Sequence, residues 1–302
     1  MIFSEIFKSQ QSEGIIRIGV PAIYIRFFTC NLQCFGFGQT HPTKKETWED
    51  PWKSVDFTKI QKLEDLPLMT KGCDSSYSWS AKVKSLQHNK SVHEVVDMFE
   101  ELLQKDSTSN KFNNPNSLVN FDLIFTGGEP LLPANQKNIV EIINELEQRN
   151  NLPNTVQIET NGTQKIGNEL LNVMFKVKNW QINCSPKLFS VSGEENKKAI
   201  KYYAISDLIK LTDTNKTVKL QFKFVVNDTQ ECWNELDYIL EDMYKYNPLL
   251  LEKNIPVSVM PVGADAEQVS KIQRSIAEKA IKRGLCFTTR LQNFIWDNGM
   301  GT

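Results

Sequence analysis

Short apolar segments with strand character alternate with helical segments along most of this chain, and this alternation constrains the fold more than any other feature. We expect strands at Ala22–Phe28, Leu123–Phe125, Val156–Glu159, Trp180–Cys184, Lys219–Val226, Pro256–Val262 and Thr288–Trp296. We expect helices at Ser91–Gln104, Asn138–Arg149, Glu195–Leu211, Glu231–Tyr246 and Asp265–Arg283. Strands that alternate with helices build a largely parallel sheet, open or closed into a barrel, so the sequence predicts an α/β fold. In such sheets the chemistry lies at the C-terminal ends of the strands.

The helix expected at Ser91–Gln104 has the clearest boundaries, because Ser91 and Glu94 form an S-x-x-E capping box ahead of an apolar helical face. With 302 residues, 40% of them hydrophobic, the chain is long enough for a single domain over 1–302 with one sizeable core. Two polar stretches interrupt the alternation, at 35–72 and at 106–117. We predict that both are flexible surface insertions.

The charge balance excludes some classes of partner. Lys and Arg number 35 against 36 Asp and Glu, so the net charge of -1 gives no broad attraction to nucleic acid or to an anionic membrane. The N-terminal segment lacks a signal-peptide pattern, and no long apolar run follows. We therefore expect a cytoplasmic protein with a small-molecule partner, no direct contact with nucleic acid and no membrane association.

The six cysteines are too sparse for a disulfide scaffold and should be reduced in the cytoplasm. Cys30 and Cys34 directly follow the first expected strand, which places two thiols in the predicted active-site layer. Closely spaced thiolates on a loop are typical ligands of iron–sulfur clusters. Taken alone, such a pair is also compatible with a structural role, with zinc binding or with chance.

The cysteine loop resembles the C-x-x-x-C-x-x-C loop of radical S-adenosylmethionine enzymes, in which three cysteines hold a 4Fe-4S cluster. Phe37 stands where the third cysteine is expected, but Cys73-Asp74-Ser75-Ser76-Tyr77 resembles the C-D-T-x-Y of the same family. We predict that 35–72 is an insertion within the cluster-binding loop and that Cys73 completes the triad. The insertion is no large obstacle, because the entropic cost of closing a loop rises by only about 0.6 kcal/mol for each doubling of the loop length. Cys184, at the end of its own strand, is the alternative third ligand.

Further segments in the expected order resemble one subgroup, the 7-carboxy-7-deazaguanine synthases. They are the G-G-E-P motif after Thr126, the E-T-N-G-T and S-P-K motifs at later strand ends, and an N-terminal E-I-F-x-S-x-Q-x-E-G pattern with a strand arginine. The resemblance implies that S-adenosylmethionine is bound by Asp74, Gly127, Gly128, Glu129, Glu159, Thr160, Asn161, Ser185, Pro186 and Lys187. It implies that the substrate is bound by Gln10, Gln11, Ser12, Glu13, Arg26 and Thr126.

Within that resemblance, Glu129 would hold the amino group of S-adenosylmethionine, and Ser75 would bind Mg²⁺ together with the substrate. Glu13 suits the N–H groups of an aminopyrimidinone edge, and Arg26 suits a carboxylate. Two positions depart from the pattern: Ser12 replaces a glycine, and Gln292 replaces the histidine of the C-terminal R-L-H motif.

The resemblance implies a partial (β/α) barrel of the radical S-adenosylmethionine type. The implied reaction contracts 6-carboxytetrahydropterin to 7-carboxy-7-deazaguanine with loss of ammonia, a carbon–nitrogen lyase reaction in 7-deazapurine (queuosine-type) biosynthesis. A reductant such as flavodoxin or ferredoxin and a homodimeric state are implied as well. Three alternatives stay open: another radical activity such as a glycyl-radical activase, a zinc-binding protein that is not an enzyme, and an inactive relative.

Overall fold

The computed structural model describes residues 1–105, 109–118, 120–296, 299 and 301. Within them the chain forms one sheet in the strand order β3-β1-β2-β4-β5-β6-β7-β8-β9. The strands are β1 (Ile2–Gln10), β2 (Pro21–Phe27), β3 (His88–Asn89), β4 (Asp122–Gly127), β5 (Thr155–Thr160), β6 (Asn179–Cys184), β7 (Val218–Val226), β8 (Val257–Pro261) and β9 (Cys286–Phe287). Every pairing from β2 to β9 is parallel, whereas β1 is antiparallel to both of its neighbours.

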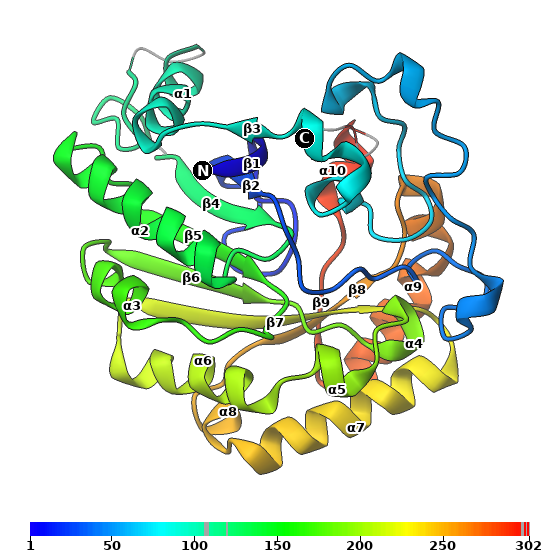
Figure 1. Cartoon of the computed structure of the whole chain (residues 1–302). Helices are drawn as coiled ribbons and strands as arrows, with labels where there is room; N and C mark the ends of the chain where they lie inside the picture. The colour runs from blue at the N-terminus through cyan, green and yellow to red at the C-terminus, as the bar shows by residue number, and fades with distance from the viewer. Residues whose placement is uncertain (106–108, 119, 297–298, 300, 302) are drawn as a thin grey trace.

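Helices connect the parallel strands. The longer ones are α1 (Val92–Lys105), α2 (Pro133–Gln148), α3 (Asn168–Met174), α6 (Tyr202–Thr214), α7 (Gln230–Tyr246) and α9 (Ala266–Lys282). Short helices lie at α4 (Phe189–Ser192), α5 (Asn196–Ala199), α8 (Leu249–Glu252) and α10 (Leu291–Trp296). Helices α2, α3, α6 and α7 lie along the outer side of the sheet, whereas α10 and the connection between β2 and β3, coloured blue to cyan, lie beyond its other side (Figure 1). The predicted α/β class, a partial barrel whose sheet stays open between β3 and β9, is confirmed.

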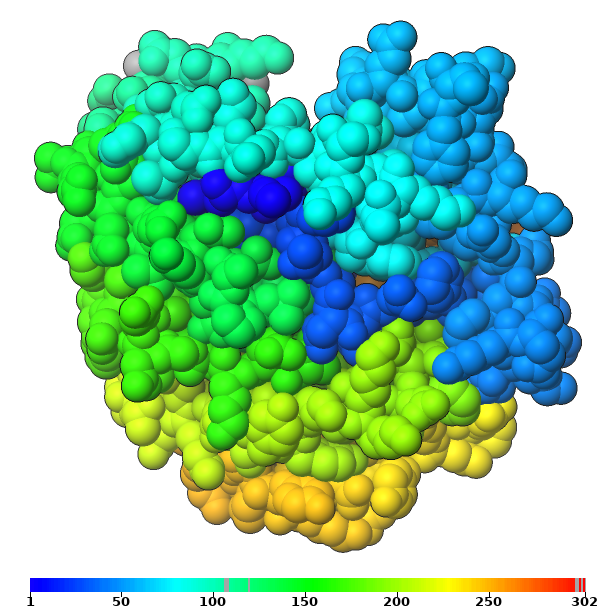
Figure 2. Space-filling view, in the orientation of Figure 1, coloured from blue at the N-terminus to red at the C-terminus, as the bar shows by residue number. Residues whose placement is uncertain are grey.

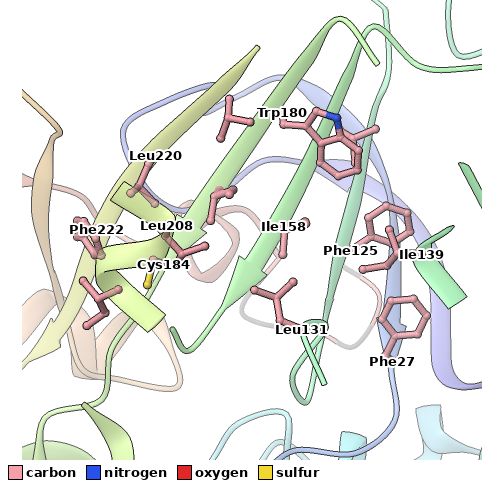
Figure 3. Close-up of a cluster of buried hydrophobic side chains, with 14 of the residues drawn as sticks. Phe27, Phe125, Leu131, Ile139, Ile158, Trp180, Cys184, Leu208, Leu220 and Phe222 are labelled. Atoms are coloured by element: carbon pink, nitrogen blue, oxygen red, sulfur yellow. The ribbon is translucent and has the colours of Figure 1, made fainter. Parts of the chain in front are cut away.

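The core fills the space between the sheet and its helices. Figure 3 shows side chains from several strands meeting Ile139 of α2 and Leu208 of α6, among them Phe27, Phe125, Ile158, Trp180 and Phe222. Because side chains alternate along a strand, the other face of the same strands carries different residues. There Gln157, Asn183 and Gln221 are buried, and they form a hydrogen-bonded row (Asn183 Nδ2 to Gln157 Oε1, 3.0 Å; Gln221 Nε2 to Asn183 Oδ1, 2.6 Å).

The capping box is confirmed: Ser91 N donates to Glu94 Oε2 (2.8 Å) and Glu94 N donates to Ser91 Oγ (3.3 Å). The helix expected at Glu195–Leu211 is interrupted, because Ile200 has an extended backbone between α5 and α6 and is buried in the core. Strand β1 was not expected, because its sequence does not alternate between apolar and polar residues. In the structure Phe3, Ser4 and Glu5 are buried in succession, where the pairing with β2 shifts register.

The predicted strand at Thr288–Trp296 is wrong. Strand β9 ends at Phe287, and the chain then leaves the sheet to contact the N-terminal loop, where Thr288 Oγ1 donates to Gly14 O (2.7 Å) and Leu291 N donates to Ser12 O (3.0 Å). Residues 291–296 then form helix α10.

The stretch 35–72 contains short 3₁₀ segments, at Lys45–Thr47, Phe57–Lys59 and Leu63–Asp65. It also buries Trp52, Leu63, Leu66 and Met69 in a small core of its own with Tyr77 and Val83, so it is more than a polar surface segment. Of the predicted insertion at 106–117, residues 106–108 lie outside the described residues, and Phe112 is fully buried in the main core. None of the described helices combines the length and apolar character that a membrane span requires.

Candidate active site

A cavity of about 530 Å³ opens at the C-terminal ends of the parallel strands. The N-terminal loop, the loops after β2, β4, β5 and β6, the inner residues of β7 and β8, and the segment around Arg290 line it. Glu64 and residues 66–70, from the stretch 35–72, form a further wall. In Figure 2 this stretch and the residues after it, in blue and cyan, make up the upper right of the molecule.

Most of the residues that the sequence singled out line this cavity. They are Gln11, Ser12, Glu13, Arg26, Cys30, Cys34, Cys73, Asp74, Ser75, Thr126, Gly127, Gly128, Glu159, Thr160, Asn161, Ser185 and Lys187. Three do not: Gln10 is exposed at the end of β1, while Glu129 and Pro186 are buried behind the surface of the cavity. The structure therefore gathers a set dispersed over more than half of the chain, and the roles of its members stay predictions.

Cys30, Cys34 and Cys73 lie in one small apolar cluster with Leu32 and Ala199. Burial raises the pKa of all three thiols, that of Cys30 to about 12; Cys73 adds to the rise at Cys30 and Cys34, and Asp74 adds to it at Cys73. As free thiols they would stay protonated near neutrality, so they become thiolates only when a metal binds them. Two amide N–H donors stand near Cys30 Sγ, Leu32 N at 3.4 Å and Asn161 Nδ2 at 3.9 Å.

Cys184, the alternative third ligand, lies elsewhere. Its side chain is fully buried in the main apolar core near Leu208 and Phe222 (Figure 3). It does not line the cavity, and a Cβ atom placed on Gly162 would lie only 2.5 Å from its sulfur. Cys73 and not Cys184 is therefore the thiol that joins the Cys30–Cys34 pair.

Three thiols gathered beside one cavity are a donor type that both iron–sulfur clusters and zinc sites use. Among the residues that the structure describes, no three His, Cys, Asp or Glu side chains come together as ligands of one metal ion. A zinc ion would draw its sulfur ligands to about 2.3 Å from one centre, whereas an iron–sulfur cube holds its cysteines on separate irons. The donor type thus suits the predicted iron–sulfur cluster, and the zinc alternative stays open.

The Gly127–Gly128 pair lets two loops approach each other. Gly127 has φ +123°, in a region that side chains rarely adopt, and a Cβ atom on Gly128 would lie 2.0 Å from Thr29 O. The backbone is tied at the same place, because Gly128 N donates to Phe27 O (3.1 Å) and Glu129 N donates to Thr29 O (2.9 Å). Because glycines stand at these two positions, the loop after β4 can pack directly against Thr29, the residue before Cys30.

Glu129 joins a third loop to this pair. Its carboxylate accepts hydrogen bonds from Leu131 N (2.9 Å), Thr160 Oγ1 (2.7 Å) and Asn161 N (2.7 Å). Burial raises the pKa of this carboxyl, and the donors oppose the rise. The carboxylate thus holds the loop after β5 in place, and its implied contact with an amino group stays a prediction.

A cluster of charged residues also lines the cavity. Glu13 forms an ion pair with Lys223, lies 3.1 Å from Arg290 Nε and accepts a hydrogen bond from Gln292 Nε2 (3.0 Å). Arg290 Nη1 also lies 2.5 Å from Asp74 Oδ2. Burial opposes ionisation of both carboxyls, but the cations outweigh it and hold the pKa of Glu13 and of Asp74 below the usual range.

Hydrogen bonds also fix further polar residues of the cavity. Gln11 Nε2 donates to Gln157 Oε1 (2.9 Å) and to Glu159 Oε1 (3.3 Å), and Thr126 Oγ1 donates to Glu159 Oε2 (2.7 Å). Lys187 Nζ donates to Ser185 Oγ (3.0 Å). Ser75 Oγ lies 3.5 Å from Cys73 Sγ, so the predicted magnesium ligand adjoins the third cysteine.

Sequence reasoning did not list Tyr77, Lys223 and Arg290, which line the cavity, or Glu5, which bonds Arg26, as members of the site. Lys223 follows Gln221 at an alternate position of β7, a period-two signal that places both on the inner face. Arg290 was part of a recognised motif but was assigned no role. Glu5 and Tyr77 were also inside motifs, but their contacts with Arg26 are visible only in the structure.

The sequence is similar to two curated proteins named 7-carboxy-7-deazaguanine synthase. That of Leptospira interrogans is 27% identical over 165 residues, 54% of this chain and about half of the relative's length (50%). That of Rhodopirellula baltica is 23% identical over the whole chain and 89% of the relative. No protein-family model matches the sequence.

Two solved structures of Streptococcus suis SuiB are more distantly similar. The one bound to S-adenosylmethionine gives a TM-score of 0.41 at 12% identity, covering 71% of this chain and 46% of SuiB. The one bound to the precursor peptide SuiA gives a TM-score of 0.40 at 14% identity, covering 67% of this chain and 42% of SuiB.

Proposed function

We propose that this chain is a radical S-adenosylmethionine enzyme that converts 6-carboxytetrahydropterin to 7-carboxy-7-deazaguanine and ammonia. The observation that carries the proposal is the convergence of Cys30, Cys34 and Cys73 at one cavity beside the Gly127–Gly128 loop. The similarity to two synthases of that name, one over the full chain, supports the same reaction.

Cys30, Cys34 and Cys73 would hold a 4Fe-4S cluster, with Asn161 and the Leu32 amide as hydrogen-bond donors to Cys30. When bound, the cluster and S-adenosylmethionine would together supply the radical chemistry. Glu159, Ser185 and Lys187 line the same cavity and would bind the polar groups of the cofactor.

The chain's own residues would also bind and orient the pterin. Arg26 would take the substrate carboxylate, and Glu13, kept ionised by Lys223 and Arg290, would accept N–H groups of the aminopyrimidinone. Ser75 would contribute one oxygen ligand to Mg²⁺. The wall formed by Glu64 and residues 66–70 would restrict water and oxygen at the reacting atoms.

The test is anaerobic reconstitution with iron and sulfide, followed by incubation with S-adenosylmethionine, reductant and 6-carboxytetrahydropterin. We expect a brown protein and a product with the mass of 7-carboxy-7-deazaguanine. Cys73→Ala should lose the cluster, whereas Cys184→Ala, the matched control in the apolar core, should retain full iron content. Full iron content in the Cys73 variant would contradict the ligand set, and a reconstituted protein that cleaves S-adenosylmethionine without forming this product would contradict the substrate.

The same assay addresses the alternatives. A glycyl-radical activase would cleave S-adenosylmethionine only with a protein partner and would not need Glu13 and Arg26 beside the cavity. An inactive relative would hold no cluster after reconstitution. The proposal includes an external reductant such as flavodoxin or ferredoxin and a homodimer, which electron-transfer kinetics and light scattering would examine.

A further inference from the structure

We propose that Tyr77 is a positioning residue for Arg26, and that the inserted stretch 35–72 supports Tyr77, so that the insertion forms part of the subsite for the substrate carboxylate. This inference rests on the proposed function, because a carboxylated pterin is the ligand that would use Arg26. It gives the insertion a role in substrate selection.

Three groups fix the guanidinium of Arg26. Its Nε donates to Glu5 Oε1 (2.7 Å), and the Tyr77 hydroxyl donates to the same oxygen (2.8 Å). The guanidinium carbon also lies 5.8 Å from the ring centre of Phe7 and 5.7 Å from that of Tyr77. None of these contacts involves a hydrogen bond from the two Nη groups of Arg26, a residue that lines the cavity. The fork that would meet a carboxylate is therefore held at its base.

Tyr77 connects this arrangement to the insertion. Its ring is buried in the small core that contains Trp52, Leu63, Leu66 and Met69 of the insertion. Its hydroxyl reaches out of that core to Glu5. The Tyr77 ring thus packs against the insertion while its hydroxyl bonds Glu5, the partner of Arg26. Looser packing of the insertion would therefore move both the ring and the hydroxyl of Tyr77 away from Arg26 and Glu5.

The chain offers a variant for each part of this connection. Tyr77→Phe removes only the hydroxyl and keeps the ring in its core. Leu63→Ala loosens the core of the insertion at a residue that does not line the cavity. Tyr202→Phe is the matched control, because the Tyr202 hydroxyl also donates to a carboxylate (Asp242, 3.2 Å) but lies on α6, outside the cavity lining.

The experiment measures the dissociation constants of 6-carboxypterin and of pterin, which lacks the carboxylate, on the anaerobically reconstituted protein. We expect the wild type to prefer 6-carboxypterin. Tyr77→Phe should weaken 6-carboxypterin binding about tenfold, in line with the loss of a hydrogen bond to a charged group, and leave pterin binding unchanged. Leu63→Ala should likewise reduce the preference for 6-carboxypterin over pterin, and Tyr202→Phe should leave this preference unchanged. A role of Tyr77 in folding alone would not separate the two ligands.

If Tyr77→Phe preferred 6-carboxypterin over pterin as strongly as the wild type does, the role of Tyr77 would be overturned while the proposed function stayed intact. A preserved preference in Leu63→Ala would overturn the contribution of the insertion. A wild type that binds both ligands equally would overturn the proposed carboxylate subsite, and this inference with it, while the iron content reports separately on the cluster.

Discussion

Glu194 holds the backbone at Cys34: its Oε1 accepts hydrogen bonds from the amides of Gln33 (2.6 Å) and Cys34 (2.9 Å), although 160 residues separate Glu194 from Cys34. Cys34 needs this support because its φ of +51° is in the left-handed region, which residues other than glycine rarely occupy. Burial opposes ionisation of Glu194, but Lys198 and the two amides outweigh it and lower the pKa of this carboxyl. The cysteine loop is thus fixed by a carboxylate far along the chain.

We expect Glu194→Ala to weaken cluster retention. Without the carboxylate the amides of Gln33 and Cys34 lose their acceptor, and the strained loop can relax away from the other thiols. The initial iron content should be near that of the wild type, but loss of the visible absorbance in air should be several-fold faster. Glu195→Ala, at the neighbouring exposed glutamate, is the control and should behave like the wild type. Equal decay rates for all three proteins would refute this role.

Gly128→Ala should disrupt both stability and the cluster. Its new Cβ would lie 2.0 Å from Thr29 O, so either the loop after β4 or the cysteine loop must shift. We expect a loss of about 2–4 kcal/mol in the free energy of unfolding and substoichiometric iron. Gly167→Ala is the matched control, since its Cβ would meet only the flexible side chain of Gln136, at 3.4 Å. Unfolding by urea and iron analysis measure the two effects, and a Gly128 variant as stable as the control would contradict the close approach.

Lys223→Met should destabilise the protein in a pH-dependent way. In the wild type Lys223 and Arg290 overcome the effect of burial and lower the pKa of Glu13, so Glu13 contributes stability above the unfolded pKa of a glutamate, about 4.5, and this contribution is lost as the pH falls through the lower folded value. Removing Lys223 raises the folded pKa and reduces the contribution. We expect a deficit of about 3 kcal/mol that is complete above about pH 5 and narrows toward about pH 3.5, measured by urea unfolding. A deficit that does not change with pH would exclude the ion pair as its cause.

Cys184→Ser should lower stability without lowering the iron content. The serine hydroxyl would be buried among apolar side chains of the main core, which costs about 1–3 kcal/mol when no partner is available. Cys286→Ser, at an exposed cysteine on β9, should change neither quantity. Thermal unfolding and iron analysis of the reconstituted proteins provide the comparison. Loss of iron in the Cys184 variant alone would return this thiol to consideration as a ligand.

The local signals in the sequence were sufficient for most elements of the fold. The capping box at Ser91 and the apolar periodicity of the parallel strands depend on near neighbours, so they can be recognised without the tertiary structure. Residues 288–296 show the limit of such signals. The apolar residues of this segment are compatible with either period. Strand β8 continues to Pro261, past Val259, the partner of Phe287, yet the chain turns away to bond Gly14 and Ser12, so contacts with a distant segment decided the structure here.

The sequence by itself determined the α/β class and which residue types could do chemistry at the strand ends, because both depend on composition and short-range order. Only the tertiary structure decided that Cys73 joins Cys30 and Cys34 while Cys184 enters the core, and that Arg26 is fixed by Glu5 and Tyr77. These outcomes depend on contacts between segments tens to hundreds of residues apart, where burial and close approach select one partner among several that are chemically equivalent in the sequence.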